Sequence, residues 1–348
     1  MDGLGDFLLE LYRLANACPA KEFQAEAMNL LQTQVKFDSG RWAHGRHKLD
    51  GERTLLENHM QNEPPELLKG YMEVAGLDDP MLRLLRLNPQ RYATRSYRSR
   101  SQWHHLPNGA MRDYQVRFRH ENVLMAVGKT VVGTDIEFRF LGMYRAHPER
   151  VFCDQDNTVM LGLLPHMLQA QTINRVTNLV AQAQASEDES HGFGIADFSG
   201  NLHFCDDTLR ALFTENWPFA RSGYIPPAMW ERLQSGGCYR DQRVSANAWR
   251  AHGMVLVRAR RRCAADNLTA REKRVGQLVS NGLTHKEIAR AMDITPATAR
   301  NYMQKLQDKL GAHGKVGIAA MMAQAVAHDP PIARHQNEQT FLLTPAGR

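Results

Sequence analysis

Two helix-start signals stand fifteen residues apart in the C-terminal quarter of this 348-residue chain, and they constrain its fold most. Thr269 and Thr284 each precede a glutamate by three residues, the capping-box spacing in which hydroxyl and carboxylate bond backbone amides at a helix start. Gly282 lies between them, where a helix end needs a left-handed residue. Asp293 favours the next turn, and Thr295-Pro296 favours a third helix start. The segment therefore predicts the helix-turn-helix plan.

The predicted third helix has two unlike faces. Spacings of four, three and four residues predict a buried stripe of Ala299, Met303, Leu306 and Leu310. The opposite face carries Arg300, Asn301, Gln304, Lys305 and Asp308. Arginine pairs with guanine, and asparagine or glutamine with adenine, in the major groove. Lysines such as Lys286 and Lys305 suit phosphates. The alternative is a small helical bundle whose polar face is only solvated.

The same segment carries a set of fixed residues in unbroken order over about 60 positions. They are Leu268-Thr269-x-Arg271-Glu272, Gly282-Leu283-Thr284-x-Lys286-Glu287-Ile288-Ala289, Ile294-Thr295-x-x-Thr298 and Lys309-Leu310-Gly311. This pattern resembles the LuxR-type (GerE-like) helix-turn-helix domain of bacterial transcription factors. The resemblance implies a four-helix domain whose third helix enters the major groove of double-stranded DNA. It assigns phosphate contacts to Lys286 and Thr298, and base-facing positions to Arg300, Asn301 and Gln304.

The resemblance also implies that the last helix, within residues 315–327, forms a dimer contact. The candidate residues for that contact are Lys315, Ile318, Met321 and Met322. Three positions depart from the usual pattern: Ala299 replaces Val, Tyr302 replaces His, and Gly314 replaces the Ser or Asn that caps the last helix. A glycine cap costs only a few tenths of a kcal/mol, so the fold is still expected.

The distribution of charge along the chain also points to the C-terminal end as the part that binds a partner. The net charge is +6, yet residues 1–257 carry a net charge of −2. The run Arg258, Arg260, Arg261 and Arg262 begins the basic surplus. A near-neutral bulk with a basic end predicts a polyanionic partner for that end, with improved solubility as the alternative.

The first 185 residues alternate between helical and strand patterns. Apolar spacings of three and four predict helices over 7–14 and 23–31, and a long one over 160–180 that Pro165 kinks or begins. Ile136 to Phe140 alternate with polar residues as a half-buried strand does. Val123 to Val127 are its predicted partner, with Gly128 and Gly133 bounding the turn.

The pattern restarts after the acidic stretch 186–190, which predicts a domain boundary. Segments 193–197 and 202–205 flank Ser199-Gly200-Asn201, a predicted tight hairpin. A helix over 207–213 and a closing strand over 254–260 follow.

The fold class expected is multi-domain, an α+β sensor region plus an all-α four-helix domain. We expect a domain over 1–185 that is similar to GAF or autoinducer-binding modules. A reduced module similar to PAS domains is expected over 191–262. The helix-turn-helix domain then covers 263–330, and 331–348 form a flexible tail.

The N-terminal part offers one set of candidate ligand residues. Glu63-Pro64-Pro65-Glu66 through Tyr71 to Asp79-Pro80 resembles the Tyr…Asp-Pro element of acyl-homoserine-lactone receptors, in which Asp and Tyr hold the lactone amide. The spacing is one residue short, and Thr94 and Arg95 stand where a second Trp is expected. The candidate ligand-binding residues are Trp42, Tyr71, Asp79 and Trp103. A turn and ordinary core packing are the alternatives.

Other site chemistries find little support. The chain has no GxxxxGKT loop, and His44, His47, His104 and His105 lack partners at metal-ligand spacing. No catalytic triad has supporting context, so no catalytic residue, metal or cofactor is expected. Five cysteines without CxxC pairs favour a reducing cytoplasm. No signal peptide or membrane-spanning run is apparent.

The sequence thus predicts a cytoplasmic, non-enzymatic transcription regulator. It would bind double-stranded DNA as a homodimer and respond to a small-molecule or protein signal. Two alternatives remain: a quorum-sensing receptor for an acyl-homoserine lactone, and a partner-binding protein whose helix-turn-helix makes protein contacts.

Overall fold

The structure, a computed structural model, shows two units, each with its own antiparallel sheet. It describes residues 2–48, 53–74, 90–99, 109–132, 135–184, 191–251, 253–325 and 341–343. The first unit comprises residues 1–185, 251–254 and 336–348, and the second comprises 186–250 and 255–335. The expected class, an α+β region followed by a helical domain, is confirmed.

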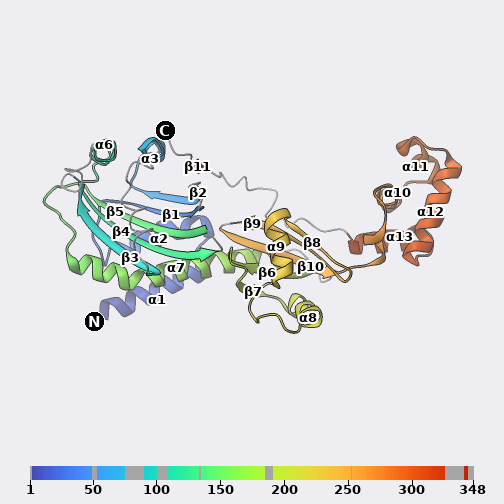
Figure 1. The fold of residues 1–348 in the computed structure, drawn as a ribbon, viewed down its shortest axis with the longest axis horizontal. Coiled ribbons are helices and arrows are strands. Elements are labelled where there is room, and N and C mark those ends of the chain that lie inside the picture. Colours follow the sequence, from blue (N-terminus) through green and yellow to red (C-terminus); the bar gives the residue numbers. More distant parts are fainter. Residues whose placement is uncertain are drawn as a thin grey trace. The chain divides into compact units, whose positions relative to one another are not determined.

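The first unit is built on six strands in the order β11-β2-β1-β5-β4-β3 (Figure 1). Neighbouring strands in this order pair antiparallel throughout. The strands are β1 (Ser39–His47), β2 (Arg53–Gln61), β3 (Tyr92–Arg98), β4 (Asn122–Val132), β5 (Asp135–Arg145) and β11 (Phe341–Leu343). Strand β11 comes from the expected tail, so three residues of that stretch complete the edge beside β2.

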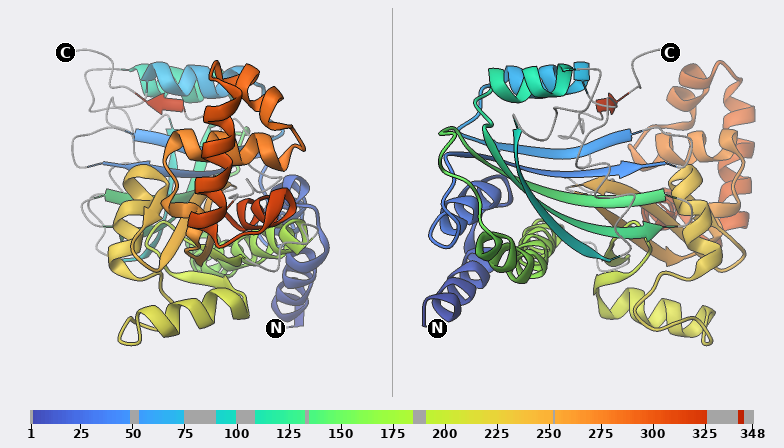
Figure 2. Two further views of the ribbon diagram at one scale, coloured as in Figure 1. Left: turned by 90° about the vertical axis from the view of Figure 1, so that its right-hand side faces the viewer. Right: turned by 60° about the vertical axis from the view of Figure 1, so that its left-hand side comes forward.

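Helices cover both faces of this sheet (Figure 2). One face packs against α1 (Asp2–Ala17), α2 (Ala20–Leu31) and α7 (Asp154–Gln184), in a core that includes Phe23 and Trp42. The other face carries α3 (Glu66–Val74) and α6 (Ala110–Arg117). Residues of these two helices, among them Tyr71 of α3 and Tyr114 of α6, form a separate apolar cluster. The sheet therefore separates two different environments.

The structure confirms the expected elements of this unit and corrects their ends. The predicted strands lie within β4 and β5, which pair directly. Gly128 does not bound their turn: β4 continues through it to Val132, and Gly133 lies outside the described residues. The helix α7 does not begin at Pro165. It begins at Asp154, where Asp156 accepts a hydrogen bond from the Cys153 amide, and it continues through the proline.

The second unit begins with a five-stranded sheet in the order β7-β6-β10-β9-β8. Its elements are β6 (Gly192–Ala196), β7 (Leu202–Cys205), α8 (Asp207–Asn216), α9 (Pro227–Gly236), β8 (Cys238–Arg240), β9 (Val244–Ala251) and β10 (Met254–Arg261). The predicted hairpin is confirmed: Gly200 has φ +82°, and the Asp197 carboxylate accepts from the Ser199 and Asn201 amides. Strand β10 lies at the centre of the sheet, which explains its unbroken burial over Met254–Arg260.

Candidate nucleic-acid interface

Four helices follow a short 3₁₀ turn, η1 (Ala264–Asn267), in the second unit. They are α10 (Ala270–Ser280), α11 (His285–Met292), α12 (Pro296–Leu310) and α13 (Gly314–Ala325). Both expected capping boxes are formed, so Glu272 accepts from the Thr269 amide at 2.9 Å and Glu287 from the Thr284 amide at 2.7 Å. These reciprocal bonds fix where α10 and α11 begin.

The turns between the helices are set by residues with positive φ. Gly282 has φ +85° after α10, and Asp293 has φ +53° after α11. Thr295 then caps α12 by accepting from the Thr298 amide at 3.1 Å. The turn from α11 to α12 is therefore only three residues long, Asp293 to Thr295, as a helix-turn-helix requires.

A compact core holds α12 against α11. Ile288 and Ala289 of α11 and Ala299, Leu306 and Leu310 of α12 are buried together. Met303 is only half-buried. Three of the four residues of the predicted stripe are therefore buried, and Met303 lies at the edge of the buried face. Burial of this stripe leaves the opposite face of α12 in solvent.

The six predicted DNA-binding residues lie on α11 and α12. Arg300, Asn301, Gln304 and Lys305 are exposed on the outer face of α12, and Lys286 is exposed in the first turn of α11. Thr298 is half-buried in the first turn of α12, where its hydroxyl lies 2.8 Å from that of Thr295. Gln304 donates to Asp308 at 3.2 Å.

The face of α12 has the chemistry of base recognition. It presents a guanidinium, an asparagine amide and a glutamine amide in less than two helical turns. These groups match guanine and adenine edges in the major groove, and a single helix fits that groove.

The arginine run lies apart from this face. Arg260 is bonded to both carboxylate oxygens of Asp266 at 2.7 Å, and both side chains are more than nine-tenths buried. Arg262 donates to the Asp241 carbonyl and to Asn267. Arg261 pairs with Glu215. The basic side chains at residues 260–262 are therefore engaged by protein partners, which local spacing does not predict because they come from other elements.

The four candidate residues for a dimer contact all lie on α13 but differ in exposure. Ile318 and Met322 are buried in the core of their own domain, and a Cβ added at Gly276 would lie 2.7 Å from the Met322 sulfur. Lys315 donates to the Leu283 carbonyl at 2.9 Å. Met321 is half-buried, whereas Val316 of the same helix, which is not among these candidates, is 83% exposed.

The two candidate ligand residues that the structure describes, Trp42 and Tyr71, do not come together. Trp42 is buried against Phe23 on the face of the first sheet that α1, α2 and α7 cover. Tyr71 lies on the other face, where the Arg41 guanidinium is 4.8 Å from its ring centroid. Because Arg41 and Trp42 are neighbours in β1, their side chains point to opposite faces. The two aromatics cannot line one site, and Asp79 and Trp103 lie outside the described residues.

The face with α3 and α6 holds a buried polar pair that the sequence did not reveal. His120 Nε2 lies 2.7 Å from Glu63 Oε1, with both side chains 2% exposed. Ser39 donates to the same carboxylate, and Tyr144 stacks on the His120 ring. Four separate segments supply these groups, so no local spacing could have predicted them.

Comparison with known proteins identifies the C-terminal part. Residues 266–322 match the family of bacterial regulatory proteins of the luxR family. No curated protein sequence matches the chain. Within the described residues, no helix is long and apolar enough to cross a membrane, and no cluster of His, Cys, Asp or Glu could hold a metal ion.

Several solved structures are similar in part. Escherichia coli SdiA is 12% identical, with 92% of this chain and 97% of that chain covered and a TM-score of 0.37. Burkholderia cenocepacia CepR2 is also 12% identical, with coverages of 50% and 96% and a TM-score of 0.35. Vibrio cholerae VqmA is 15% identical, with coverages of 47% and 96% and a TM-score of 0.17. With TM-scores below 0.5, these likenesses do not establish a function. The sequence match and the geometry of α10–α13 identify residues 266–322 as a luxR-family helix-turn-helix domain.

Proposed function

We propose that the chain binds double-stranded DNA sequence-specifically as a homodimer and regulates transcription in response to a signal. The observation that carries this proposal is the exposed face of α12, with Arg300, Asn301 and Gln304 displayed beside Lys305. A dimer would place two such helices on half-sites about 10 base pairs apart. All five cysteines are free, which supports action in the cytoplasm.

Each expected domain has its own proposed role. Residues 1–185 would sense the signal, 191–262 would relay it, and 263–330 would read DNA; apart from β11, the expected tail over 331–348 lies outside the described residues. In the first unit, the face with α3 and α6 is the better candidate for signal binding. It holds the buried His120–Glu63 pair and the Arg41–Tyr71 contact, whereas the opposite face is a closely filled apolar core. Buried polar groups of this kind fix the orientation of a small ligand.

The first test is DNA selection from a genomic library with the full-length protein. A palindromic motif with half-sites about one helical turn apart is expected. Light scattering on the complex would give two chains per site. Absence of any enriched motif, in the presence and absence of cell extract as a signal source, would contradict the DNA-binding proposal.

Two substitutions then separate base reading from phosphate contact. Arg300→Ala should cost about 1–3 kcal/mol at one base pair and relax specificity there. Lys286→Ala should weaken binding equally on all sequences and flatten the salt slope by about one unit. Lys273→Ala, at a half-buried lysine of α10 outside the proposed face, is the control. Unchanged DNA binding in both variants would contradict the proposal that α12 enters the major groove.

A further inference from the structure

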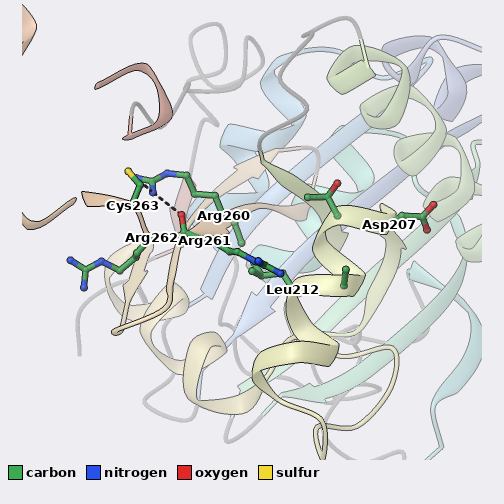
Figure 3. Close-up of a pocket in the computed structure, with 9 residues that line it drawn as sticks. Asp207, Leu212, Arg260, Arg261, Arg262 and Cys263 are labelled. Atoms are coloured by element: carbon green, nitrogen blue, oxygen red, sulfur yellow. Dashed lines mark hydrogen bonds between the residues drawn. The ribbon is translucent and has the colours of Figure 1, made fainter. Parts of the chain in front are cut away.

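A pocket of about 700 Å³ lies in the second unit, between α8 and the end of β10 (Figure 3). Thr208, Ala211 and Leu212 line it from α8. Ala259 and the arginines 260–262 line it from β10 and the residues that follow. The pocket thus combines an apolar floor with a cationic wall.

Two of the three arginines that line this pocket are paired with carboxylates outside the lining. Three arginines line it against one carboxylate, Asp207, which is paired with Arg210 at 2.7 Å. Arg260 is committed to Asp266 in a buried bidentate pair. In Figure 3, Arg262 points away from α8.

Arg261 is the cation that a ligand could use. Its side chain lies beside Leu212, is 72% exposed, and pairs with Glu215, which is itself half-exposed. Exposed pairs of this kind contribute little stability. A bound anion that brings two oxygens to the guanidinium can therefore replace Glu215 at small cost.

The cationic wall is also the connection to the DNA-binding domain. Strand β10 ends at Arg261, and η1 begins three residues later at Ala264. Arg260 and Arg262 bond Asp266 and Asn267 of η1. Ala265 of η1 is buried in the core of the helix-turn-helix domain. Hydrogen bonds and burial thus join this wall to the helix-turn-helix domain.

We propose that this pocket binds a small carboxylate with a short apolar tail and that its occupancy changes DNA affinity. The carboxylate binds Arg261, and the tail packs on Ala211, Leu212 and Ala259. The ligand site stands independently of DNA binding, whereas its regulatory effect rests on the proposed function.

The ligand site is tested with hexanoate as the probe and the full-length protein. Saturable binding is expected by calorimetry, and Arg261→Gln should weaken it about tenfold, because a charge-assisted hydrogen-bonded pair is lost. Ala211→Phe fills the pocket from an exposed position of α8 and should weaken binding similarly. The neutral hexanamide should bind about tenfold more weakly than hexanoate.

Arg243→Gln is the matched control, because it removes the same charge from an exposed site outside the lining. Its affinity for hexanoate should equal that of the wild type. Absence of saturable binding to the wild type, or equal binding by the wild type, Arg261→Gln and Ala211→Phe, would overturn the site.

The regulatory half is tested on the DNA motif selected above. Saturating hexanoate should change the DNA dissociation constant of the wild type at least about threefold, within the range of ordinary allosteric coupling. It should leave that of Arg261→Gln unchanged. Binding of hexanoate with no change in DNA affinity would refute the coupling. Failure to select any DNA would instead refute the proposed function, and the calorimetric result would still decide the ligand site.

Discussion

At the scale of single residues, Glu272 links two ends of the helix-turn-helix domain. Its carboxylate accepts from the Thr269 amide at the start of α10 and from the Lys309 ammonium near the end of α12, at 2.9 and 2.7 Å. The Lys309 hydrogen bond first, and the Thr269 amide next, lower the pKa of Glu272 from 4.5 to about 2. The ionised form is thus the one that stabilises the fold.

This pKa predicts a pH dependence of stability. Because the folded pKa lies below the ordinary value, the stabilisation is complete above about pH 5 and is lost as the pH falls towards 2. Glu272→Gln should lower stability at neutral pH and flatten that acid limb. The stability of this domain as a function of pH is measured by hydrogen exchange of the α10 and α12 amides in the full chain. Glu231→Gln, an exposed glutamate of α9, is the control; an acid limb equally steep in the Glu272 variant would contradict this role.

At the scale of elements, the start of α13 shows why a familiar pattern must be checked against backbone geometry. The sequence pattern treats Gly314 as a slightly inferior cap in place of Ser or Asn. In the structure Gly314 has φ +69°, a conformation that glycine adopts without steric cost and serine does not. Glycine is therefore the residue this helix start requires.

The substitution Gly314→Ser should accordingly destabilise α13 by about 1 kcal/mol, because a side chain is forced into the left-handed region. Gly314→Asn should cost less, since asparagine tolerates that region better. Chemical unfolding combined with hydrogen exchange of α13 amides gives the order glycine, asparagine, serine from most to least stable. A serine variant as stable as the wild type would show that the helix start can rearrange.

At the scale of the whole molecule, the chain passes from the first unit to the second and then returns. Residues 336–348 belong to the first unit, and Phe341, Leu342 and Leu343 pair with Leu55, Thr54 and Arg53 of β2. Without β11, the start of β2 is a sheet edge with unpaired backbone groups. The end of the chain thus contributes to the sheet of the proposed sensor.

Truncation after residue 335 should therefore loosen the first sheet locally. The amides of Arg53–Leu55 should exchange faster with solvent, because their ladder partner is gone. Truncation after Thr344 keeps β11 and should exchange as the wild type does. Equal protection of these amides in both truncated proteins would exclude a structural role for β11.

The sequence by itself determined the features whose hydrogen bonds are local. Thr269, Thr284 and Gly200 act on atoms within a few residues, so the helix starts of the DNA-binding domain and the β6–β7 hairpin follow from their chemistry. The exposed face of α12 follows in the same way, since its apolar stripe must be buried.

Tertiary structure decided everything that depends on a distant partner. Strand β1 was not predicted because its sequence lacks apolar alternation. Its buried His44 is hydrogen-bonded to Glu137 of β5, ninety-three residues away. The arginine run suggested a polyanion, yet the Glu215 carboxylate and the Asp241 carbonyl come from distant segments to bond Arg261 and Arg262. Burial and ion pairing depend on which segments the fold brings together, and local spacing carries no information about that choice.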